Sequence, residues 1–240
     1  MGQGTPHARP LGHLVAAAGL ALLALGARAG PALTPTETTW LDLGTPVLAD
    51  ALREKLPIDI VVQPAAHAGD PPLALGFEGG RCKLVLSMRG NPAAQATLDA
   101  IAPDLLGPAV EAMTAHEVGH CWRYVHGQWH RVPAGFVSAP PPGDDAPRLA
   151  QLQREMDETR REEGFADLVG LAWTARRHPA LYARVHAWLT DVRGHEPAQG
   201  GHHDTLAWLR AAAEPGAFDA ARNPFEAALP VWQRALSAEP

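Results

Sequence analysis

Charged residues, cysteines and long apolar runs are all scarce in this 240-residue sequence. The scarcity of charge and of long apolar runs argues against particular kinds of partner. Charged residues make up 19%, the net charge is -6 and no basic cluster occurs, which disfavours nucleic acid or an anionic membrane surface as a partner. After residue 25 no segment is apolar enough to cross a bilayer, which takes about 20 residues. A hydrophobic content of 46% still indicates a globular chain. We therefore expect no nucleic-acid partner and no stable membrane insertion of the mature protein.

The first 29 residues have the pattern of a signal peptide. Arg9 gives a weakly positive start, residues 14–25 are apolar or small, and Ala27-Arg28-Ala29 supplies a cleavage site. An uncleaved anchor is the alternative interpretation, whereas the absence of a cysteine after the cleavage site argues against a lipid anchor. We expect residues 1–29 to be removed and residues 30–240 to form a single exported domain, periplasmic or secreted.

Only two cysteines, Cys82 and Cys121, are present. In an oxidising compartment an even pair predicts one disulfide, and the alternative is two separate buried thiols. Cys121 directly follows His120, and a one-residue step on a helix turns its side chain about 100° away. We therefore expect Cys121 to face the core.

The order of elements predicts an α+β domain, with a little β-structure first and helices after it. A β-branched run and an alternating run predict strands at residues 58–62 and 82–89. Capping residues and apolar spacing predict helices at residues 34–54, from 92, 108–126, 148–177, from 179, 203–213 and 224–236. The order of the predicted strands and helices divides the domain into three parts: a sheet with one long helix (30–131), a proline-rich loop (132–147) and a helical part (148–240).

The informative motif is His116-Glu117-Val118-Gly119-His120, which lies in the expected helix 108–126. Two histidines four residues apart project from one face of a helix and can hold one ion, for which zinc is the usual choice. Glu117 is not needed for coordination but is placed to take a proton from a water molecule. The motif therefore predicts a catalytic zinc site, which needs a third protein ligand.

Two residues compete for that third position. His126 lies where an extended H-x-x-G-x-x-H motif has its last histidine, but Arg123 replaces the glycine that turns the chain back. The other candidate is Glu163, with Glu162 beside it. Glu163 and Asp167 are again four apart, so one acid can ligate zinc while the other accepts the N–H of a ligand histidine.

The two motifs together, H-E-x-x-H and the later Glu163-Gly164-Phe165-Ala166-Asp167, resemble the pattern of the gluzincin metallopeptidases. The form E-x-x-A-D looks like that of the branch that includes the CAAX prenyl proteases. The resemblance implies a zincin-like fold, zinc ligands His116, His120 and Glu163, Glu117 as general base, and Asp167 as the partner of a ligand histidine. This sequence differs from that branch in lacking transmembrane helices, so membrane substrates are not implied.

Peptide hydrolysis also needs a donor for the oxyanion that develops on the attacked carbonyl. His203, followed by Asp204, is the first candidate, and His202 and Tyr124 are alternatives. We expect residues 82–89 to form the edge strand along which an extended peptide substrate pairs. The sequence thus predicts an exported zinc metallopeptidase acting on polypeptides. The alternatives are a peptidoglycan-directed zinc amidase or endopeptidase, and a non-catalytic zinc-binding structural protein.

Overall fold

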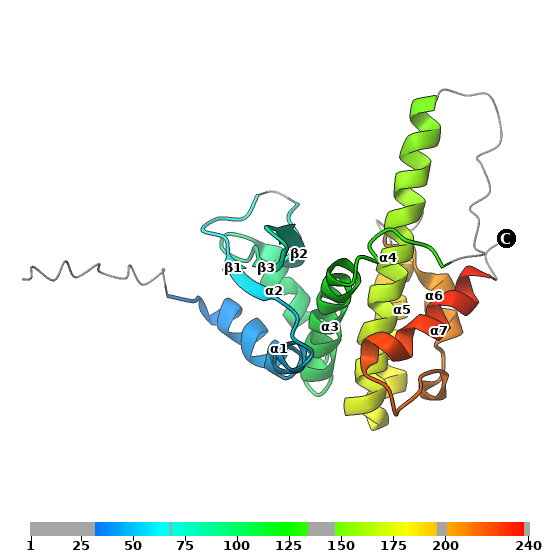
Figure 1. Cartoon of the computed structure of the whole chain (residues 1–240). Helices are drawn as coiled ribbons and strands as arrows, with labels where there is room; N and C mark the ends of the chain where they lie inside the picture. Colours follow the sequence, from blue (N-terminus) through cyan, green and yellow to red (C-terminus); the bar gives the residue numbers. More distant parts are fainter. Residues whose placement is uncertain (1–31, 68, 134–146, 196–200, 238–240) are drawn as a thin grey trace, which may run out of the picture. The chain divides into compact units, whose positions relative to one another are not determined.

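The computed structural model describes residues 32–67, 69–133, 147–195 and 201–237, and the chain from Leu33 onward is one compact unit (Figure 1). The expected signal peptide and most of the proline-rich loop lie outside the described residues. Within those residues, no helix combines the length and apolar character needed to span a membrane. Helices and a small sheet are both present, so the predicted α+β class is confirmed.

Helix α1 (Pro35–Arg53) opens the unit and is tied to the sheet at its N-terminus. Thr34 and Glu37 form a capping box, in which the Glu37 N–H donates to Thr34 Oγ1 (3.2 Å) and the Thr34 N–H donates to Glu37 Oε2 (2.7 Å). Glu37 also accepts two hydrogen bonds from Arg89, at 2.7 and 3.0 Å, just beyond the last strand. The start of α1 is therefore fixed against the sheet.

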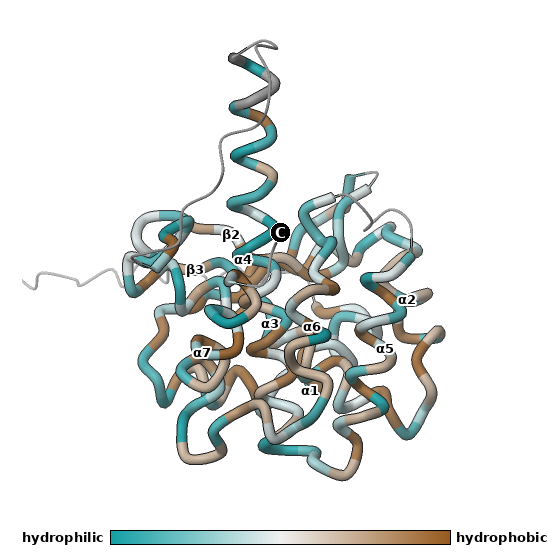
Figure 2. Tube along the Cα trace, turned by 90° about the vertical axis from the view of Figure 1, so that its right-hand side faces the viewer, coloured by the Kyte–Doolittle hydropathy of each residue, from teal (hydrophilic) through white to brown (hydrophobic). Residues whose placement is uncertain are grey.

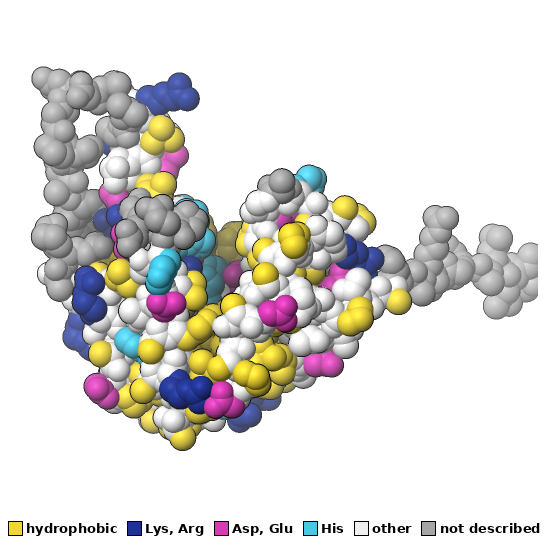
Figure 3. Space-filling view, turned by 180° about the vertical axis from the view of Figure 1, so that it is seen from behind, with side chains coloured by type: hydrophobic (Ala, Val, Ile, Leu, Met, Phe, Trp, Pro, Cys, Tyr) yellow, Lys and Arg dark blue, Asp and Glu magenta, His cyan; other side chains and the backbone are white. Residues whose placement is uncertain are grey.

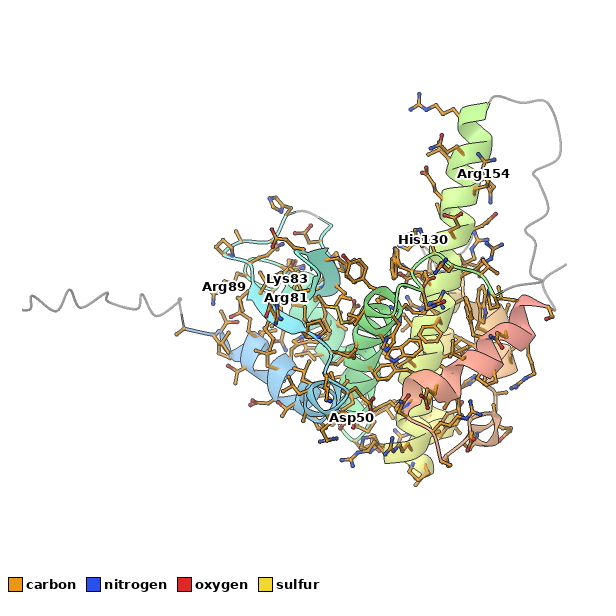
Figure 4. The ribbon with its side chains drawn as sticks, in the orientation of Figure 1. Asp50, Arg81, Lys83, Arg89, His130 and Arg154 are labelled. Carbon is orange, nitrogen blue, oxygen red and sulfur yellow. A yellow bond between two sulfur atoms is a disulfide. The ribbon has the colours of Figure 1, made fainter. Side chains whose placement is uncertain are left out.

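The sheet has three strands, β1 (Ile58–Val62), β2 (Leu73–Glu78) and β3 (Arg81–Leu86), in the order β1-β3-β2. β3 pairs parallel with β1 and antiparallel with β2. The β2–β3 turn contains Gly79 and Gly80, both with positive φ, where glycine avoids the strain of a side chain. Arg81 and Lys83, both labelled on β3 in Figure 4, donate to Asp59 on β1, which adds a polar cross-strand contact.

The strand predicted at residues 82–89 is shorter than expected and is not an edge strand, so that prediction is wrong. It ends at Leu86 and lies in the middle of the sheet, with Leu84 and Leu86 buried. The alternation of its side chains gave the buried face correctly but carries no information about which strands pair beside it. β2, which the sequence did not predict, pairs only with β3 among the described strands and so has an open edge.

Helices α2 (Pro92–Asp99) and α3 (Leu106–Val125) follow the sheet, close to the predicted positions. α2 begins at Asn91, whose side chain accepts from the Ala93 N–H. α3 continues past Arg123 and ends with His126 as its C-cap, followed by Gly127 with φ of 63°. The chain therefore does not turn back toward the motif histidines at Arg123, where the extended H-x-x-G-x-x-H motif has its glycine.

Helix α4 (Pro147–Arg177) is the longest element, and its first half extends beyond the neighbouring helices as a mainly hydrophilic segment (Figures 1 and 2). From Glu162 to Thr174 the helix is buried against α3. Two glycines allow the close approach. A Cβ on Gly119 would lie 3.2 Å from the Val169 side chain, and one on Gly170 would lie 2.7 Å from the Ala112 carbonyl oxygen.

The C-terminal helices cover the other side of α4. They are α5 (Tyr182–Gly194, preceded by a short 3-10 helix at Pro179–Leu181), α6 (Leu206–Ala211) and, after a second 3-10 helix (Pro215–Ala217), α7 (Pro224–Leu236). α6 is shorter than the predicted helix 203–213. Its Trp208 packs on Gly164, where a Cβ would come within 2.4 Å of the indole ring, so α6 lies directly against α4 at this point.

A disulfide joins Cys82 at the start of β3 to Cys121 on α3, with the two Cα atoms 5.7 Å apart. Both residues are fully buried. The bridge closes a loop across a sequence separation of 39 residues, and a crosslink of this kind contributes about 2–4 kcal/mol to stability. It fixes the sheet against the helix that carries the two motif histidines.

Candidate metal centre

The two motif histidines lie one turn apart on α3 and are both buried, with exposed fractions of 8% for His116 and 6% for His120. Their Nε2 atoms are 3.1 Å apart, so both ring nitrogens point at the same small region. Glu163 on α4 completes the group. Its Oε2 lies 3.2 Å from His116 Nε2 and its Oε1 lies 3.5 Å from His120 Nε2.

These three residues fit a divalent cation of the zinc type. Zinc bonds nitrogen and oxygen at about 2.0–2.1 Å, and a tetrahedral arrangement then separates the ligand atoms by about 3.3–3.4 Å. The two Nε2 atoms are 3.1 Å apart, His116 Nε2 lies 3.2 Å from Glu163 Oε2, and His120 Nε2 lies 3.5 Å from the other carboxylate oxygen, Oε1, so each of these pairs is close to the separation that zinc requires. Glu163 Oε2 is buried and makes no hydrogen bond among the described residues, although imidazole nitrogens lie beside it. Two imidazoles and one carboxylate are also the donors that zinc takes in hydrolytic sites.

Asp167, one turn after Glu163 on α4, contacts Nδ1 of His116, on the side of the ring away from Glu163. The His116 Nδ1–H donates to Asp167 Oδ1 at 2.8 Å, which leaves Nε2 directed toward Glu163. Asp167 also accepts two hydrogen bonds from Arg193 on α5 (2.7 and 2.9 Å) and one from the Thr205 hydroxyl before α6 (2.5 Å). Burial opposes its ionisation, but Arg193 and His116 keep the pKa of Asp167 well below its ordinary value. The carboxylate therefore holds the Nδ1–H of His116 and keeps Nε2 on the side of Glu163.

The surroundings shift the pKa values of the two histidines in opposite directions. Burial disfavours the charged imidazolium of His116, but Asp167 and Glu163 outweigh it and raise the pKa of His116 to about 10. Burial is not outweighed at His120 and lowers its pKa to about 4. Burial likewise opposes ionisation of Glu163, whose pKa the two imidazoles nevertheless hold well below its ordinary value. A metal ion bound at Nε2 of His116 would have to displace a proton from that atom, because imidazole coordinates metals in its neutral form.

Glu117 lies between the two histidines in the sequence but is not part of the ligand group. It faces a cavity of about 390 Å³, which His116, Asp167 and His203 also line. In Figure 3 the hollow on this face has histidine and apolar side chains at its walls. Burial raises the pKa of Glu117 to about 7. A carboxyl group that titrates near neutrality is suited to accept and return a proton.

Of the three candidate oxyanion donors, His203 is the one that contacts the ligand group. Its Nε2 lies 3.2 Å from Glu163 Oε2, and its side chain is 42% exposed. The His202 ring contacts it at a tilt, with ring centroids 4.1 Å apart, and burial together with His203 lowers the pKa of His202. Tyr124 instead stacks on Phe77, with ring centroids 3.9 Å apart.

The competing ligand candidates are engaged elsewhere. His126 is exposed at the end of α3 and its Nδ1–H donates to the Trp122 carbonyl oxygen at 2.8 Å. Glu162 forms a buried ion pair with Arg123 (2.8 and 2.9 Å) and accepts the backbone N–H of His130, which Figure 4 labels beside α4. Neither belongs to the group formed by the motif histidines and Glu163.

Three residues at the site were missed by the sequence analysis: Arg193, Thr205 and Trp129. Arg193 and Thr205 reach Asp167 from α5 and from the turn before α6, so only the packing of those elements brings them there. The Trp129 ring stands edge-on to the His120 ring at 5.5 Å. The one sequence signal for Trp129 was its position two residues after Gly127, which ends the helix, so that the chain there stays near the last turn of α3.

Compared with known protein families, with curated proteins and with solved structures, the chain matches none of them, so the candidate site rests on its own residues and geometry.

Proposed function

We propose that this protein is a zinc-dependent metallopeptidase of the gluzincin type, in which His116, His120 and Glu163 hold the metal. The observation that carries the proposal is the convergence of these three side chains from two helices, with Glu117 beside them on α3. A purely structural zinc site is usually closed by four protein ligands and has no use for a base, which favours hydrolysis over a non-catalytic role.

Zinc, when bound, polarises the attacked carbonyl and lowers the pKa of water. Glu117 takes a proton from the attacking water and returns it to the leaving amine. Asp167 keeps the Nε2 of His116 directed at the metal position by holding its Nδ1–H. His203, half-exposed beside Glu163, donates its N–H to the developing oxyanion.

The substrate peptide pairs along the open edge of β2 in this proposal, in place of the strand at residues 82–89. β2 starts at Leu73, which lines the cavity with Glu117, and reaches Phe77, which packs edge-on against Trp129 beside His120. An extended peptide on this edge therefore runs past the metal position. Backbone pairing gives affinity, and the pockets beside the strand give specificity.

We also propose that the protein is exported and that residues 1–29 are its signal peptide. The apolar run and the Ala27-Arg28-Ala29 site support this, and the Cys82–Cys121 disulfide is typical of an oxidising compartment.

The test is hydrolysis of a quenched peptide library by the chain from Gly30 onward, with zinc content measured on the same samples. We expect the Glu117→Gln variant to keep one zinc per chain and to lose about 10²–10⁴-fold in rate, because the base is removed and the ligands remain. Glu54→Gln, an exposed position at the end of α1, serves as the matched control with unchanged activity.

Retained hydrolysis in the Glu117→Gln variant contradicts the role of the base. Loss of zinc in that variant assigns Glu117 to coordination instead.

A further inference from the structure

Another cavity, the arginine pocket, lies between the C-terminal ends of α1 and α4. It encloses about 230 Å³ and is lined by Asp50 and Arg53 of α1 and by Trp173, Arg176 and Arg177 of α4. Sites for drug-sized ligands enclose roughly 300–1,000 Å³, so the arginine pocket has room for a small ligand only.

The three arginines come from segments that are far apart in the sequence, so the sequence itself shows no basic cluster. Arg53 lies in the last turn of α1, and Arg176 and Arg177 lie in the last turn of α4. The negative end of each helix dipole is equivalent to about half an elementary charge. Two such ends and the carboxylate of Asp50 do not neutralise three guanidinium groups, so a net charge of about +1 remains in the pocket.

Two of the three guanidinium groups have no anionic partner in the part of the chain that the structure describes. Asp50 accepts a hydrogen bond from Arg53 at 2.6 Å. The side chains of Arg176 and Arg177 form no hydrogen bond or ion pair with any described residue. An anion that enters the pocket therefore meets two cations without having to break an existing ion pair.

Trp173 limits the freedom of one of these cations. The guanidinium carbon of Arg177 lies over the indole ring, 5.7 Å from its centroid, which is within the range of a cation–π contact. The ring is buried, and its N–H donates to Glu111 Oε2 at 2.7 Å. A guanidinium group that already rests on an anchored ring loses less conformational entropy when it binds an anion.

The arrangement favours a phosphate group over a carboxylate. A carboxylate has two oxygens in one plane, and a single guanidinium group satisfies both of them. A phosphate group is tetrahedral, so guanidinium groups that approach from α1 and from α4 can bond different oxygens of it. The net charge of -6 and the small volume disfavour a nucleic acid or a membrane, which bind to extended positive surfaces.

We propose that the arginine pocket binds the phosphate group of a small soluble molecule, which Arg53, Arg176 and Arg177 hold. The arginine pocket shares no lining residue with the cavity beside Glu117 and contains none of the candidate metal ligands. The inference is therefore independent of the proposed hydrolase function.

Isothermal titration calorimetry with inorganic phosphate, glycerol 3-phosphate and acetate tests the proposal. We expect both phosphate compounds to bind at one site per chain, and to bind more tightly than acetate. Arg177→Gln should weaken phosphate binding by at least about tenfold, because hydrogen bonds between charged groups are lost. Arg154→Gln, at an exposed arginine that Figure 4 labels near the opposite end of α4, is the matched control and should leave phosphate binding unchanged.

Arg176→Gln provides a second variant, because this exposed side chain makes no contact with the Trp173 ring. It should weaken phosphate binding in the same way, which a loss of packing on Trp173 does not explain. No phosphate binding by the wild type, equal affinity for phosphate and acetate, or phosphate binding that both variants leave unchanged overturns the inference.

Two further titrations identify where the phosphate binds and what carries it. Phosphate binding should persist after a chelator has removed all metal, and binding by the metal-loaded protein alone overturns the inference. Vesicles that contain phosphatidylglycerol should not bind. Vesicle binding that depends on Arg177, without binding of glycerol 3-phosphate, contradicts a soluble ligand and assigns the pocket to a membrane.

Discussion

Single residues hold the two histidines of the candidate metal centre in different ways. The Nδ1–H of His116 donates to Asp167, which is itself saturated by Arg193 and Thr205. His120 Nδ1 is buried and has no hydrogen-bond partner among the described residues. The Trp129 ring stands nearly perpendicular to the His120 ring instead, with ring centroids 5.5 Å apart. His116 is thus oriented by a hydrogen-bond network and His120 mainly by packing.

The neighbouring histidines His202 and His203 provide a matched pair at the residue scale. We expect His203→Ala to lower kcat by about 10²–10³-fold with zinc retained, because an oxyanion donor acts mainly in the transition state. His202→Ala should change kcat by less than about tenfold, since His202 contacts His203 and not Glu163. Steady-state kinetics and zinc content of both variants decide the matter. Zinc loss in His203→Ala alone shows that His203 serves the ligand group instead.

At the scale of elements, the candidate site depends on how α1, α3 and α4 are held together. α3 and α4 approach closely because Gly119 and Gly170 have no side chain at the points of contact, and this brings Glu163 to the histidines. α1 contributes Trp40 to the cavity, one turn after Glu37, which bonds Arg89 at the end of the sheet. The Glu37–Arg89 contact therefore fixes one wall of the cavity.

That contact makes part of the stability depend on pH. The Arg89 guanidinium holds the pKa of Glu37 below its ordinary value, although burial acts in the opposite direction. Because the pKa is lowered by folding, the stabilisation is complete above the pKa of an unfolded glutamate, about 4.3, and is lost as the pH falls through the lower folded value. We expect the wild type to be more stable than Glu37→Gln at pH 7 and this advantage to shrink below about pH 4.

Urea unfolding of both proteins between pH 7 and pH 3 measures the difference. Glu54→Gln, which changes an exposed glutamate at the other end of α1, should show no such trend. A difference between wild type and Glu37→Gln that stays constant down to pH 3 contradicts the ion pair as its source.

At the scale of the whole molecule, the sequence predicts the helices better than the sheet. Helix boundaries with strong local signals, such as Thr34 before α1 and Asn91 before α2, agree with the structure because a cap is a contact within a few residues. β2 was missed because it has Gly76 inside it and lies between turn residues. The order of strands depends on pairing between distant segments, which alternation alone does not encode.

The difference between local contacts and contacts between distant segments also determines which residues of the site could be predicted. His116 and His120 share a face because of helix geometry, so their convergence follows from the spacing alone. Glu163 and Asp167 could be proposed from their own four-residue spacing, but their meeting with α3 depends on the glycine-mediated crossing of the two helices. Arg193 and Thr205 have no local signal, since only the packing of α5 and α6 on α4 brings them to Asp167.

The most direct test of the account is the zinc affinity of three proteins, measured by competition with a chromophoric chelator. We predict one zinc per chain for the wild type, the same affinity for His126→Ala, and at least about a hundredfold loss for Glu163→Ala, since even the partners of zinc ligands are worth 10–100-fold. Full zinc affinity in Glu163→Ala together with its loss in His126→Ala contradicts the assignment of His116, His120 and Glu163 as the metal ligands.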